Sequence, residues 1–139
     1  MGTRKLGRPT AHRMSMLYGM VAYLIENSKI ETTLTRAKEV SSLAEKMITL
    51  GKKGGLANYR RALAVLPEPT AKKLFDVVAP QYSDVNGGYT AVYKLGPRRG
   101  DGAEMALIIL TGTNVAATTA PVEETKEDKA TEVKAEDAE

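Results

Sequence analysis

Apolar side chains recur every three or four positions through the first half of the chain, which is the period of helices with one buried face. In the first of these segments the apolar face consists of Met14, Leu17, Tyr18, Val21, Leu24 and Ile25. The same period continues, with interruptions at glycine and proline, as far as Pro80. The predicted helices cover residues 10–27, 36–50 and 56–65 and a short segment between Thr70 and Pro80.

Three threonines stand where helix caps are expected. Threonine is favoured at such positions because its side-chain oxygen accepts a hydrogen bond from a free backbone N–H of the first turn. We therefore expect Thr10, Thr35 and Thr70 to cap the first, second and fourth helices. Gly51 follows the second apolar stripe and fits the left-handed residue that commonly ends a helix.

Three further segments have the pattern of strands. Residues 29–33 alternate around Ile30, and residues 89–95 place Tyr89, Ala91, Tyr93 and Leu95 on one face, which we expect to point to the core. The segment 105–110 is apolar at every position, as expected of a strand that is covered on both sides. It should therefore occupy the centre of the sheet and pair with residues 89–95 as an antiparallel hairpin.

The predicted order is helix, strand, three helices and two strands, which defines an α+β fold. We expect a three-stranded mixed sheet with the last strand central, the strand at Ile30 on one edge, and helices packed on the sheet. The length allows one small domain of roughly 120 ordered residues. The predicted organisation is a basic arm over residues 1–13, a globular domain over 14–120 and a disordered acidic tail over 121–139.

Charge distinguishes the tail from the rest of the chain. Residues 1–120 contain 17 Lys and Arg against 9 Asp and Glu, whereas residues 121–139 contain 3 against 8. The overall net charge of +3 therefore conceals a basic domain with an acidic tail. A basic domain of this size favours polyanions such as nucleic acid, although many solvated surfaces are also basic. The tail has too few apolar residues to offset the entropy of ordering it.

Two segments concentrate the basic residues. The N-terminal arm combines lysine and arginine with two glycines and a proline, so we expect it to be mobile in the free protein and to order on RNA. The predicted hairpin loop, residues 96–102, carries Arg98 and Arg99 side by side between glycines and a proline. Such a loop fits an ordinary solvated turn and a phosphate-binding loop equally well.

The chain offers little for catalysis or for metal binding. It has no cysteine and a single histidine, His12, so neither a thiolate site nor a zinc site is predicted. Asp101 and Glu104 are the carboxylates that stand close together beside the basic turn, where they are expected to offset the arginines or to end the loop. The apolar runs are shorter than a membrane span, and no secretory signal is recognisable, so a cytoplasmic protein is expected.

Four ordered blocks of the sequence resemble one known family. They are residues 4–13 (RKLGRPTAHR), 30–40 (IETTLTRAKEV), 48–54 (ITLGKKG) and 87–96 (GGYTAVYKLG). In order and spacing they resemble the seventeenth protein of the bacterial large ribosomal subunit, over residues 1 to about 111. The acidic tail is similar to variable extensions found in that family.

The resemblance implies a structural protein that binds large-subunit ribosomal RNA on the outer side of the subunit, near the exit of the peptide tunnel. It further implies one copy per ribosome, contacts with neighbouring ribosomal proteins, and neither enzymatic activity nor a cofactor. A regulatory DNA-binding protein is the alternative that the charge would also explain. Carried over position by position, the resemblance implies RNA contacts from Arg4, Lys5, Arg8, His12, Arg13, Arg36, Lys38, Arg98 and Arg99.

Overall fold

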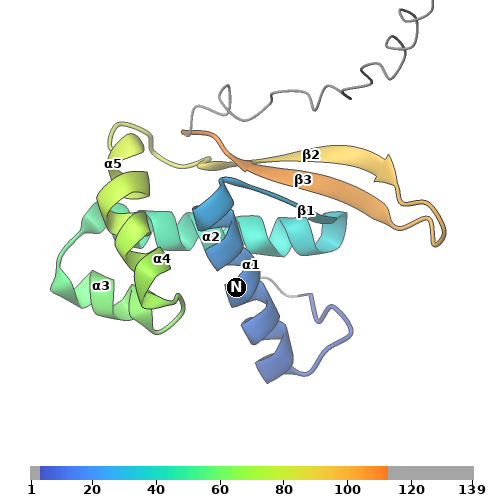
Figure 1. The fold of residues 1–139 in the computed structure, drawn as a ribbon, viewed down its shortest axis with the longest axis horizontal. Coiled ribbons are helices and arrows are strands. Elements are labelled where there is room, and N and C mark those ends of the chain that lie inside the picture. The colour runs from blue at the N-terminus through green and yellow to red at the C-terminus, as the bar shows by residue number, and fades with distance from the viewer. Residues whose placement is uncertain (1–3, 113–139) are drawn as a thin grey trace, which may run out of the picture.

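Residues 4–112 are described by the computed structural model, and they form a layer of helices on one face of a sheet (Figure 1). The helix-strand-helices-strands order and the α+β class predicted from the sequence are confirmed. The residues of the predicted tail, 121–139, lie outside the described part. The elements are α1 (Thr10–Asn27), β1 (Lys29–Thr33), α2 (Leu34–Lys53), α3 (Leu56–Leu63), α4 (Glu68–Lys73), a π-helical turn η1 (Leu74–Val78), α5 (Ala79–Gln81), β2 (Thr90–Pro97) and β3 (Glu104–Leu110).

The sheet has the strand order β1-β3-β2, so the last strand is central, as predicted. Both edge strands pair antiparallel with β3, with Ile30 opposite Ile108 on one side and Val92 opposite Ile108 on the other. The prediction of a mixed sheet is therefore wrong. The alternation of side chains carries no information on strand direction, so the pattern could not predict that all three strands are antiparallel. Ser28, which has a left-handed backbone (φ 62°), ends α1 immediately before β1.

The core lies between the sheet and α2, which runs along the helical face (Figure 1). Val40 and Ile48 of α2 and Ile108 and Leu110 of β3 are completely buried. Gly51 also belongs to this packing, because a Cβ at this position would lie 3.0 Å from Cβ of Ala79. The prediction that Gly51 ends the helix is wrong, since α2 continues to Lys53. The glycine is needed instead for the close approach of Ala79.

None of the three predicted caps is used. α1 begins at Thr10 itself, with Pro9 as the residue before it, and α2 begins at Leu34, after Thr33. Neither helix has a side-chain hydrogen bond at its cap. Pro9 suits the position before α1, because proline has no backbone N–H that would be left without a partner at a helix start.

Thr70 has a different role in the interior of the fourth helix, which runs without a break through α4, η1 and α5. Its side chain is 1% exposed and donates a hydrogen bond to Oε1 of Glu26, at 2.6 Å. The helix also passes through Pro80, where it was predicted to end. The π-helical turn precedes this proline, and its wider hydrogen-bond spacing accommodates a residue that has no N–H.

α3 is shorter than predicted, and part of its apolar sequence is exposed. Leu56 and Leu63 are apolar residues of this helix, but they are 65% and 38% exposed. Tyr59 does pack against the core, in an edge-to-face contact with Phe75 at 5.3 Å between ring centroids. With only eight residues, α3 reaches the core through one narrow line of side chains, so the remaining apolar positions stay in contact with solvent.

Among the residues that the structure describes, β3 is covered on one face only, contrary to the prediction. Its inward residues are fully buried, whereas Leu107 and Ile109 alternate with them and are half-buried. Tyr93 and Leu95 of β2 were predicted to face the core and are instead 56% and 52% exposed. Every helix described between residues 4 and 112 lies on the opposite side of the sheet (Figure 1), so the uninterrupted apolar sequence of β3 has no second covering layer in this part of the chain.

Candidate RNA-binding surface

The loop between β2 and β3 is a closed turn held by its own hydrogen bonds. The backbone N–H of Arg98 donates to the carbonyl of Ala103 at 2.7 Å, and the N–H of Gly102 donates to the carbonyl of Arg98 at 3.0 Å. Asp101 accepts two hydrogen bonds from the Arg98 guanidinium, at 3.0 and 2.6 Å, and one from the backbone N–H of Ala103 at 3.2 Å. The expectation that Asp101 offsets an arginine of this loop is confirmed.

The two arginines of the loop therefore differ. The hydrogen bonds from Arg98 hold the pKa of the Asp101 carboxyl well below its usual value, and the same hydrogen bonds raise the pKa of Arg98. Arg99 is exposed and makes no ion pair or side-chain hydrogen bond with any residue between 4 and 112. Arg98 shapes the turn, and Arg99 is left at its tip with all its donors available.

The N-terminal arm is folded back on the domain in the structure. The side chain of Leu6 packs against the core, and the turn is closed by hydrogen bonds from Arg8 to the carbonyls of Lys5 and Leu6, at 3.1 and 3.2 Å. Leu6 and Gly7 both have left-handed backbone angles (φ 52° and 65°). The half-buried side chain of Leu6 and these hydrogen bonds define the position of the arm from residue 4 onward, and its mobility in the free protein stays a prediction.

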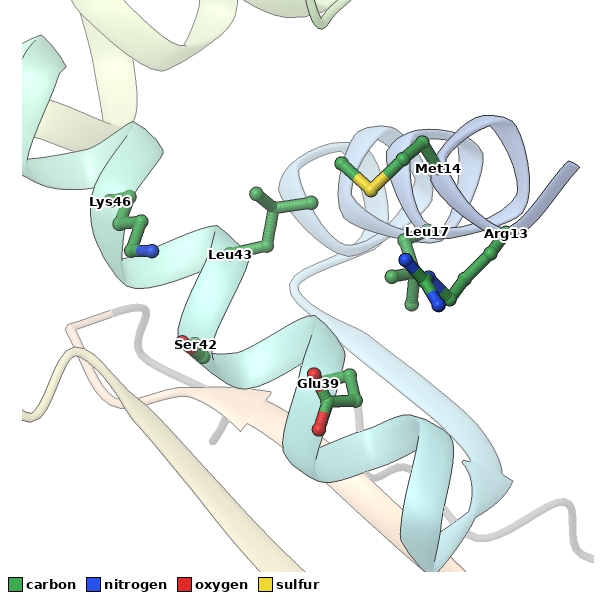
Figure 2. Close-up of a pocket in the computed structure, with 7 residues that line it drawn as sticks. All are labelled: Arg13, Met14, Leu17, Glu39, Ser42, Leu43 and Lys46. Atoms are coloured by element: carbon green, nitrogen blue, oxygen red, sulfur yellow. The ribbon is translucent and has the colours of Figure 1, made fainter. Parts of the chain in front are cut away.

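The arm lies beside the first half of α2. Arg4 forms an ion pair with Glu39 at 3.9 Å, and Arg13 and Glu39 both line a small groove of about 120 Å³ between α1 and α2. Figure 2 shows Leu43 pointing from α2 toward Met14 and Leu17 of α1. The groove is too small for a nucleotide, so its cations act as part of a surface.

The remaining predicted contacts lie on the two helices. His12 is exposed and Arg13 half-buried in the first turns of α1, so these two residues belong to a helix and not to an extended arm. Arg36 is half-buried and Lys38 is exposed in the first turns of α2. The first turn of α2 contains no acidic residue, so the positive end of its dipole is not offset there.

The strand register brings these segments to the same end of the fold. Met105 at the start of β3 lies between Thr33, which precedes α2, and Gly96, which enters the hairpin loop. The start of α2 and the arginine loop therefore project from the same end of the sheet, and the Arg4–Glu39 pair attaches the arm to that helix. In Figure 1 the arm, the start of α2 and the hairpin loop all lie toward the right of the view. We call the nine predicted contact residues, which lie on these three segments and in the first turns of α1, the basic end.

A second group of exposed cations was not included in the predicted site. It comprises Arg60 and Arg61 on α3 and Lys72 on α4. Two adjacent arginines occur at 60–61 as they do at 98–99, so the same feature of the sequence could have identified this second group. Two neighbouring lysines are used by the fold instead. Lys73 donates to the carbonyl of Glu26 at 2.7 Å, and Lys52 donates to the carbonyl of Val85 and lies 5.3 Å from the ring centre of Tyr89.

The described residues contain little that could support catalysis. Between residues 4 and 112 no three His, Asp or Glu side chains are grouped so that they could hold a metal ion. None of the helices in this range has both the length and the apolar content needed to cross a membrane. The surface therefore offers cations and hydrogen-bond donors, which is the chemistry that binds phosphate oxygens.

Comparison with known proteins agrees with this chemistry. A sequence profile described as ribosomal protein L17 matches residues 16–111. The chain is 60% identical over 110 residues to the large ribosomal subunit protein bL17 of Clostridium tetani, an alignment that covers 78% of this chain and 97% of the relative. The corresponding protein of Clostridium acetobutylicum is 59% identical over 110 residues, covering 78% and 96%. The chain therefore belongs to the ribosomal protein L17 family.

Proposed function

We propose that this protein is a structural component of the large ribosomal subunit, present in one copy, and that it binds large-subunit ribosomal RNA near the exit of the peptide tunnel. Membership of the L17 family and the name of its relatives, large ribosomal subunit protein, support the assignment to this subunit. Proteins of this family are structural, so the protein acts without catalysis, in the cytoplasm, among RNA and protein neighbours.

The observation that carries the RNA-binding proposal is the convergence at the basic end. Three segments that are far apart in the sequence supply their cations there: the arm, the start of α2 and the hairpin loop. Arginine binds phosphate oxygens through paired donors, and several such contacts fix the orientation of a protein on RNA. If these cations served only to keep the surface solvated, they would not need to lie together at one end of the sheet.

Within the basic end the residues differ in how readily they reach a phosphate. Lys5, His12, Lys38 and Arg99 are exposed and unpaired with other side chains in the described part of the chain. Arg4 and Arg98 already have carboxylate partners, which RNA phosphates would share or replace. The turn at Leu6 places the arm beside α2, so the cations of the arm can bind RNA together with those of the helix.

Sedimentation and salt dependence test the proposal together. The full chain should co-sediment with purified large subunits in a sucrose gradient. Its affinity for large-subunit RNA should fall with salt, with a slope of about −0.7 to −0.9 per phosphate neutralised. A flat salt dependence would contradict phosphate binding. Sequence-specific binding to duplex DNA that survives high salt would instead identify a regulatory DNA-binding protein.

A further inference from the structure

The outer face of the sheet, on the side away from the helices, is apolar and uncovered. It consists of three strand rows: Ala91 and Tyr93 of β2, with Leu95 beside them at the bulge; Met105, Leu107 and Ile109 of β3; and Lys29, Glu31 and Thr33 of β1. The register places Tyr93 opposite Leu107 and Leu107 opposite Glu31, so these three side chains form one row across the sheet. No element between residues 4 and 112 packs on this face (Figure 1).

We infer that this outer face is the docking surface for another protein of the large subunit, one that presents an apolar patch of its own. The inference rests on the proposed function, because a large ribosomal subunit surrounds its proteins with other proteins as well as with RNA and solvent. Contiguous exposed apolar patches mark interaction sites, and aromatic and methionine side chains are enriched at protein–protein interfaces. Tyr93 and Met105 supply both kinds of side chain here.

Charge decides between the two kinds of neighbour. RNA-binding sheets stack bases on aromatic side chains that are accompanied by cations, and phosphates have to approach the same surface. Here the row that contains Tyr93 ends in the carboxylate of Glu31, which would repel a phosphate. Lys29 and Glu31 are the charged residues on this face, and their charges cancel. The face is therefore neutral and apolar, whereas the cations of the protein gather at the basic end.

The geometry also makes the two surfaces compatible. The basic end is at the loop of the β2–β3 hairpin, and the outer face is formed by the strands of the same hairpin. RNA held at the loop leaves the strands accessible to a protein beside it. A polar rim, provided by Lys29, Glu31 and Thr33 along β1, borders the apolar centre, and this is the usual arrangement of a protein–protein interface.

Site-directed cross-linking tests the inference in intact particles. The chain has no cysteine, so Tyr93→Cys, Leu107→Cys and Arg99→Cys each introduce a single thiol. Large subunits that contain each variant are purified, labelled with a thiol-reactive aryl azide and irradiated. We expect Tyr93→Cys and Leu107→Cys to attach to the same large-subunit protein, several-fold more than to RNA, and Arg99→Cys to attach mainly to ribosomal RNA.

Other outcomes would overturn the inference. Attachment of the outer face to RNA, attachment to a second copy of this chain, or incorporation into subunits without any attachment each contradicts protein docking. Tyr93 is 56% exposed, so its variant should fold even if the half-buried Leu107 does not tolerate the change. Failure of the wild-type chain to sediment with large subunits would instead reject the proposed function itself, and is measured in the same gradient.

Discussion

The β2–β3 hairpin contains two exposed regions that differ in what makes them available for binding. At the loop, cations are held by hydrogen bonds within the turn, and the Arg98–Asp101 contact leaves Arg99 free at the tip. Along the strands, the outer face presents aliphatic side chains and Tyr93 with no covering element in the part of the chain that the structure describes. One hairpin thus combines a polar surface suited to phosphates with an apolar surface suited to protein.

This difference shows that the exposed residues of the hairpin have to be distinguished by whether their side chains are charged or apolar. The buried face of β3 stabilises the fold, because Ala106, Ile108 and Leu110 are completely buried against the helices. The outer face of the same strand has the same apolar composition and lies outside that core. If the outer face serves binding and not folding, substitutions on the two faces should have unequal effects on stability.

The largest expected effect is therefore on the stability of the free domain. Ile108→Ala should lower the free energy of unfolding by about 2–5 kcal/mol, because it leaves a cavity in a completely buried site. Ile109→Ala, one position along and on the outer face, should lower it by about 1 kcal/mol or less, since the side chain is only half-buried. Urea denaturation of both variants measures the comparison. Equal losses would show that the outer face is part of the folding core.

A second prediction separates the loop from the strands by RNA binding. Replacing Arg98 and Arg99 together by Ala should reduce the salt slope of RNA binding by about 1.4 to 1.8, if each arginine neutralises one phosphate. The domain should keep its helical circular dichroism, because both side chains are exposed and the pairing of β2 with β3 does not depend on them. Loss of helical signal in this variant would mean that the arginines are structural.

The matched control lies on the outer face. Tyr93→Ser combined with Leu107→Thr removes apolar surface without changing charge, and threonine is well suited to a strand. This double variant should bind large-subunit RNA with unchanged affinity and an unchanged salt slope. A loss of RNA affinity as large as that of the arginine variant would mean that the RNA also covers the sheet, and the contrast between the two regions would no longer hold.

Much of this architecture follows from the sequence alone. The bounds of α1 and β1 and the central position of β3 were predicted from the periodicity of apolar residues. Periodicity reports that a side chain is apolar, and it does not report whether another layer will cover it. For that reason Tyr93, Leu95 and the outer residues of β3 were assigned to the core, although none of the helices in residues 4–112 covers them.

The errors at the helix ends and within the candidate site have a similar origin. Gly51 was interpreted from its local preference for a left-handed turn, but its place is determined by Ala79, which is distant in sequence and adjacent in space. Likewise, the composition of the arm does not reveal that Leu6 packs against the core or that Arg8 closes a turn there. The division between Arg98 and Arg99 depends on the hydrogen bonds of Asp101, which adjacent residues in a sequence do not reveal.

The smallest expected effect concerns the Arg98–Asp101 contact in acid. The pKa of Asp101 is lowered in the folded protein by the hydrogen bonds from Arg98, so its ionised form is favoured by folding. The resulting stabilisation is present above the ordinary aspartate pKa of about 4 and is lost only as the pH falls through the lower pKa of the folded state. Because both side chains are half-exposed, the loss should change the loop and leave the global stability almost unaltered.

NMR titration of the Asp101 carboxyl carbon measures this effect directly. In the wild-type protein the titration midpoint should lie well below the ordinary value, and in Arg98→Ala it should move upward toward that value, because the largest cause of the shift has been removed. The hydrogen bond from Ala103 to Asp101 remains in the variant, so a smaller downward shift should persist. Identical midpoints in the two proteins would show that Arg98 does not hold Asp101 in solution. Arg98 would then be as free as Arg99 to bind phosphate, and the loop would present two equivalent arginines to RNA.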